Sequence, residues 1–84
     1  MGKTIVTRIQ TGVRMETSLL KVLKGLAEYA DLSLGDLLEG IVLHSFEGKA
    51  PFSTETRAVI EQLKSVYGCS LRAEDSHMLT EDAK

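Results

Sequence analysis

Arginine, glutamine and glycine occupy alternate positions near the start of the chain. Arg8, Gln10, Gly12 and Arg14 are separated by Ile9, Thr11 and Val13. Alternate side chains of an extended segment point to one face, so the guanidinium and amide groups would lie together. A guanidinium donates paired hydrogen bonds to planar acceptors, and a primary amide both donates and accepts. The pattern therefore predicts a polar binding face on a short strand.

The charge of the chain is divided between its two ends. Residues 1–24 hold five basic residues and one acidic residue, a net charge of +4, whereas residues 25–84 carry a net charge of −6. The total of −2 hides this division. Because a segregated charge acts on a partner locally, the first 24 residues are the expected anion-binding part of the chain.

Hydrophobic periodicity predicts one strand and three helices. Alternation from Thr4 to Met15 predicts the strand. Leucines at helical spacing predict a first helix from about Thr17 to near Asp31. Ser33 is the expected N-cap of a second helix that closes at Gly48, and a third helix is expected from Ser53 to Gly68. The predicted buried face of the second helix contains Leu37, Leu38, Ile41, Val42 and Phe46.

A chain of 84 residues with one strand needs a second copy to satisfy that strand. A lone strand leaves its backbone groups unpaired, and two short helices cannot enclose the leucines present. Antiparallel pairing of residues 9–15 from two chains would satisfy both demands. We therefore expect a mainly helical, intertwined homodimer with an intermolecular two-stranded antiparallel ribbon and a C-terminal helix. Gly40, inside the second helix, either admits a partner helix or is simply tolerated.

The order of these segments resembles the ribbon-helix-helix DNA-binding proteins, such as the Arc and MetJ repressors. The resemblance spans Ile9 to Phe46 and rests on three stretches, "QTGVRM", "SLLKVLKGLAEYA" and "DLSLGDLLEGIVL". It implies a ribbon that enters the major groove of double-stranded DNA. By position, it implies base contacts from Gln10, Gly12 and Arg14, and phosphate binding at Ser33, Leu34 and Gly35.

The chemistry of these residues agrees with that implication. Arginine can donate two hydrogen bonds to guanine, and glutamine can pair with adenine. A helix N-terminus offers free N–H groups to a phosphate. Lys3 and Arg8 are either a phosphate-contacting arm or solvated charge, and Lys21 and Lys24 are interpreted chiefly as a solvated helix face. The expected dimer core comprises Val13, Met15, Leu23, Leu37, Gly40 and Ile41.

Other classes of function find little support in the sequence. No nucleophile with a base, phosphate loop or placed carboxylate pair is evident, so we expect no enzyme, no catalytic residues and no cofactor. Cys69 and His77 alone do not define a metal site. No membrane span or secretory signal is evident, which favours the cytoplasm.

The sequence thus predicts a DNA-binding transcriptional regulator, most simply a repressor, that acts as a homodimer and can assemble further on DNA. Residues 1–48 would form the DNA-binding and dimerisation domain, and residues 49–84 a linker, third helix and polar tail. Two alternatives stay open. Residues 50–84 could bind a toxin protein, as in an antitoxin, or the fold could serve dimerisation without binding DNA.

Overall fold

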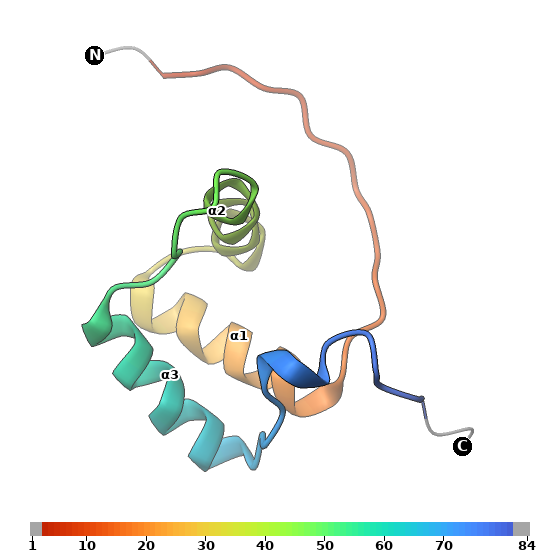
Figure 1. Ribbon diagram of the computed structural model, residues 1–84. Coiled ribbons are helices and arrows are strands. Elements are labelled where there is room, and N and C mark those ends of the chain that lie inside the picture. Colours follow the sequence, from red (N-terminus) through yellow and green to blue (C-terminus); the bar gives the residue numbers. More distant parts are fainter. Residues whose placement is uncertain (1–2, 82–84) are drawn as a thin grey trace.

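A computed structural model describes residues 3–81 of the chain. Three α-helices follow an extended N-terminal segment: α1 (Thr17–Ala30), α2 (Leu34–Phe46) and α3 (Thr54–Tyr67). A short 3₁₀ turn, η1 (Ala73–Asp75), lies in the C-terminal segment. Helices α1 and α3 lie side by side in one layer, and α2 lies over them (Figure 1).

The predicted strand is absent from the described residues, so the predicted ribbon-helix-helix fold is wrong for this structure. Residues 3–15 are extended and make no backbone–backbone hydrogen bond to another described residue. A strand needs a neighbouring strand for its backbone groups, and the described chain supplies none. The alternating pattern of residues 4–15 therefore marks an extended segment rather than part of a sheet.

The predicted helix boundaries are confirmed. They could be predicted because each is set by capping groups close by in the sequence. The Ser33 hydroxyl accepts a hydrogen bond from the Asp36 N–H at 3.1 Å, and the Ser53 hydroxyl accepts one from the Thr56 N–H at 3.1 Å. Glu16 caps α1 with its carboxylate. Helix α3 ends at Gly68, whose φ of 66° is the left-handed value that glycine adopts without strain.

The core lies where α1 meets α3 and the start of α2. Leu26 is only 1% exposed and clusters with Ala27 and Leu37. Half-buried apolar residues from all three helices and the linker surround this cluster: Leu23, Ile41, Phe52, Val59, Ile60 and Leu63. Because α1 shares its core with α3, the segment from residue 49 to the end of α3 contributes to the same packed unit as residues 17–48. The predicted boundary at residue 48 stays a prediction.

Gly25 lets α1 approach α3 closely. A side-chain carbon at this position would meet a Leu63 methyl at 3.1 Å and the Tyr67 ring at 3.6 Å. These distances leave almost no room for a methyl group between the helices. A methyl group here would need the Leu63 side chain to shift by a few tenths of an ångström, so glycine favours the close approach although it weakens the middle of the helix.

The buried face of α2 is narrower than predicted. Leu37 is buried and Ile41 packs against the core, but Val42 and Phe46 are exposed and Leu38 is only half-buried. On α3, Val66 and Tyr67 are likewise exposed. The sequence pattern identified apolar residues correctly but could not show that the chain has too few partners to cover them.

Replacing Leu26 with alanine should destabilise the protein by about 2–5 kcal/mol, because it leaves a cavity at the contact between α1, α2 and α3. Val66→Ala is the matched control, since Val66 is 73% exposed and its loss should change stability by no more than about 0.5 kcal/mol. Urea unfolding followed by circular dichroism measures both. Equal effects of the two substitutions would contradict the core assigned to these helices.

Candidate nucleic-acid interface

The predicted binding residues lie on an exposed N-terminal arm, residues 3–14, which leads into α1. Every residue of the arm is exposed, and Lys3, Arg8 and Arg14 are its only charged residues. The arm leaves the start of α1 and arches past α2 (Figure 1). It therefore presents a net charge of +3 on backbone that solvent can reach.

Arg8 fastens the middle of the arm to α2. Its Nε donates to Glu39 Oε2 and its Nη2 donates to Glu39 Oε1, both at 2.8 Å. Asp36 lies 3.9 Å from the same Nη2. Hydrogen bonding to the guanidinium, followed by its charge, lowers the pKa of Glu39, and the same hydrogen bonds raise the pKa of Arg8. The pair has the bidentate geometry that an arginine also uses on phosphate or guanine.

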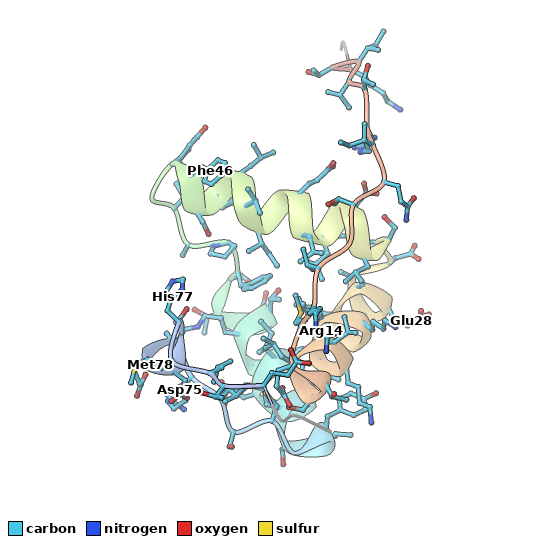
Figure 2. The ribbon with its side chains drawn as sticks, turned by 90° about the vertical axis from the view of Figure 1, so that its right-hand side faces the viewer. Arg14, Glu28, Phe46, Asp75, His77 and Met78 are labelled. Atoms are coloured by element: carbon cyan, nitrogen blue, oxygen red, sulfur yellow. The ribbon has the colours of Figure 1, made fainter. Side chains whose placement is uncertain are left out.

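Arg14 fastens the base of the arm to the C-terminal segment. Its guanidinium forms a two-pronged ion pair with Glu81. Figure 2 places Arg14 where the arm meets α1, beside the C-terminal segment that carries Asp75. Both arginines of the predicted binding face thus have carboxylate partners in the same chain.

The N-terminus of α2 lies close to Arg8. Ser33 caps the helix, and Leu34 and Gly35 begin it. Asp36, in that first turn, is the second carboxylate beside Arg8. The structure therefore brings Arg8 together with the predicted phosphate site at residues 33–35. The Asp36 carboxylate already interacts favourably with the helix dipole there, which disfavours a second anion.

The other predicted binding residues are distributed along the arm. Gln10 and Gly12 lie between the two ion-paired arginines, and a side-chain carbon at Gly12 would meet nothing within 4 Å. Lys3 lies at the outer end of the described arm. The structure does not gather Gln10, Gly12 and Arg14 into a rigid face, because the segment has no neighbouring strand to hold it.

Some of the residues predicted to form a dimer core lie in the core of the single chain, and others lie on its surface. Leu37 is buried within the single chain, and Leu23 and Ile41 pack against the same cluster. Met15 is half-buried and Val13 is 75% exposed. A side-chain carbon at Gly40 would have open space around it. That these six residues form the core of a dimer stays a prediction.

Sequence reasoning missed the acidic partners of the two arginines. Glu39 is 31 residues from Arg8 and Glu81 is 67 residues from Arg14, so no local spacing connects them. The only signal was the separation of charge between the two parts of the chain. That separation indicated attraction but not which residues would pair.

The remaining candidates do not assemble into a site. Cys69 is buried and reduced, whereas His77 is exposed in the C-terminal segment. Within residues 3–81, no three histidine, cysteine or acidic side chains come together as metal ligands. None of the described helices is long and apolar enough to cross a membrane.

Comparison of the chain with models of known protein families gives no match, and comparisons with curated proteins and with solved structures give none either. Arguments about function therefore rest on the arm, its charges and the exposed surfaces of the helices.

The ion pair between Arg8 and Glu39 should depend on pH. Because the pKa of Glu39 is lowered in the folded protein, the pair contributes to stability above the ordinary carboxyl pKa and is lost as pH falls through the lowered value. In an NMR titration of side-chain carboxyls, Arg8→Ala should return the pKa of Glu39 towards its ordinary value. Arg14→Ala, which removes the other ion pair, should leave it lowered. An unchanged Glu39 titration in Arg8→Ala would show that the arm does not contact α2.

Proposed function

We propose that the protein is a DNA-binding transcriptional regulator of the cytoplasm that acts as a homodimer and contacts double-stranded DNA with its N-terminal arm. The observation that carries this proposal is the arm itself: twelve exposed residues with three cations, no acidic residue and no backbone partner among the described residues. An extended cationic segment can follow the sugar–phosphate backbone or enter a groove.

The side chains of the arm divide between two tasks. Arg14 and Gln10 have the donors and acceptors that distinguish bases, whereas Lys3 and Arg8 suit phosphate oxygens. Gly12 carries no side chain and has open space, so the backbone can approach DNA closely there. Arg14 is the best-positioned reader because it adjoins the first turn of α1, whereas the outer arm lacks such an anchor.

Binding DNA requires the arginines to exchange partners. Arg8 must leave Glu39 and Arg14 must leave Glu81, and each would gain a phosphate or base in return. Both ion pairs are exposed, and exposed pairs contribute little stability because water and salt screen them. The carboxylates therefore weaken DNA binding without preventing it.

The same ion pairs favour a second candidate function, dimerisation without DNA binding. If the two arginines serve only to attach the arm to the rest of the chain, Arg8 keeps Glu39 and Arg14 keeps Glu81 as its partner, and neither binds DNA. DNA titrations decide between the two functions. Arg14→Ala should reduce binding in the first case, and in the second the parent protein should bind no duplex.

Replacing Arg14 with alanine should cost about 1–3 kcal/mol for each base that the arginine would otherwise bind, and should relax the preference at guanine positions. Affinity falls because alanine has no donors for guanine. The measurement is a titration of a selected high-affinity duplex and of a random duplex by fluorescence anisotropy. Selection from a random duplex pool with the parent protein supplies the first of these.

Lys21→Ala provides the contrasting variant, since Lys21 is an exposed cation of α1. Any weakening should be equal for both duplexes and should reduce the slope of log affinity against log salt by about one unit for each phosphate that the lysine would otherwise neutralise. If Arg14→Ala binds the selected duplex with the affinity and selectivity of the parent, the base-reading role of Arg14 is wrong.

A further inference from the structure

Helix α2 is apolar on more sides than the single chain covers. Seven of its thirteen residues are Leu, Ile, Val or Phe, yet Leu37 is its only buried residue. A helix that is apolar almost all round is normally enclosed by other elements. Among the described residues, α2 packs on α1 and the core beneath it, and Arg8 of the arm contacts it through Glu39.

The exposed and half-buried residues of α2 form a continuous outer stripe, which consists of Gly35, Leu38, Val42 and Phe46, with Leu43 and the ion-paired Glu39 beside it. The spacings of three and four residues place them on one side of the helix. Val42 is 43% exposed, Leu43 63% and Phe46 82%. Figure 2 shows Phe46 at the end of α2, away from the other labelled residues.

The chain exposes much more surface than a folded monomer of its mass. Its accessible area is 7462 Å² for 9.2 kDa, whereas a monomer of this mass exposes about 4,900 Å². The exposed arm and the exposed apolar residues, among them Val42, Leu43 and Phe46 of α2, contribute to this excess of about 2,500 Å² per chain. Covering about half of it in each of two copies would give a total in the range of obligate homodimers, about 2,000–5,000 Å².

The outer stripe is shaped to fit a second copy of itself. Its largest residue, Phe46, lies at one end, and Gly35, which has no side chain, lies at the other. Gly35 has no atom within 4 Å of where a side-chain carbon would stand, so the space beside it can accept a ring. Two such stripes in antiparallel orientation place each phenyl ring over the other chain's glycine. Leu38 and Leu43 then face each other by the same symmetry.

Charge is compatible with this orientation. Residues 40–46 contain no Asp, Glu, Lys or Arg, and Glu39, which faces Val42 of the other copy in this register, has its charge paired with Arg8. Asp36 and Glu39 lie towards the start of α2, and beyond its end Lys49 forms an ion pair with Glu47 at 3.4 Å. Antiparallel helices keep the two acidic starts of α2 apart from each other, and their dipoles oppose favourably.

We propose that the outer stripe of α2 is the homodimer interface, with two α2 helices antiparallel about a two-fold axis and Phe46 of each copy packed over Gly35 of the other. The inference rests on the homodimer of the proposed function and names the surface that forms it. A two-fold interface of this kind closes on itself, because every contact occurs twice.

Sedimentation velocity over a range of concentrations tests the surface. The parent protein should be dimeric, and Phe46→Ser should raise the dimer dissociation constant roughly a hundredfold or more, because each dimer loses two buried rings. Val66→Ser is the matched control: it removes an equally exposed apolar side chain from α3 and should leave the dimer intact. Circular dichroism should show unchanged helix content in both, since neither side chain is buried.

A swap of the two end residues tests the register. Gly35→Phe should dissociate the dimer by filling the space that receives the ring, and adding Phe46→Gly should recover the parent dissociation constant to within about tenfold. A dimer that survives Gly35→Phe, or a double variant that stays monomeric, overturns the register. Equal weakening by Val66→Ser and Phe46→Ser overturns the surface.

A monomeric parent at all concentrations overturns the homodimer itself and assigns the stripe to a different partner. None of these measurements uses DNA. A protein that dimerises as expected but binds no duplex would therefore retain this interface and lose the proposed DNA-binding role.

Discussion

The close packing of α1 on α3 is the constraint on which the rest of the structure depends. Gly25 has no side chain, which lets α1 lie close to Leu63 of α3. Leu26 of α1 packs in the core where α1, α2 and α3 meet. Through this contact the apolar face of α1 is covered by a helix of its own chain. Helix α2 is consequently left with one shared face and one free face, and the arm is left with no element on which to fold.

The free face of α2 and the free arm are two consequences of the same shortage of partners. A domain of this size buries a smaller fraction of its surface than a large domain does, so apolar residues beyond the first core are left for a second molecule to cover. The arm has the opposite problem, because its exposed residues include cations that a hydrophobic core cannot accept. An apolar interface on α2 and a polar partner for the arm would therefore serve the two surfaces separately.

Local signals in the sequence predicted the helices well and the fold poorly. Ser33, Ser53 and Gly68 act through bonds to nearby backbone, so their capping roles follow from adjacent residues. The prediction of a strand was wrong because alternation of apolar and polar residues indicates an extended backbone, whereas a sheet also requires a neighbouring strand. Val42 and Phe46 were predicted on a buried face for a related reason: periodicity identifies an apolar stripe but not whether anything covers it.

Of the candidate site, Arg8 and Arg14 were identified as charged binding groups, but Glu39 and Glu81 lie too far along the chain for spacing to reveal them.

The exposure of the acidic partners makes the proposed DNA binding compatible with a net charge of −2. An arginine free in water and an arginine paired with an exposed carboxylate differ little in free energy, since solvent screens the pair. The bidentate geometry that Arg8 adopts on Glu39 is one that it could reproduce on a phosphate, so exchange of partners conserves its hydrogen bonds. DNA offers many phosphates along its length, whereas each arginine has one or two carboxylates within the chain. In the proposed homodimer the arm would occur twice, so the second arm would bind at a high effective concentration once the first had bound. Under the proposed function the total charge of the protein is a poor guide to its partner, because affinity would depend on the few cations that can reach the DNA and on how weakly their own carboxylates hold them.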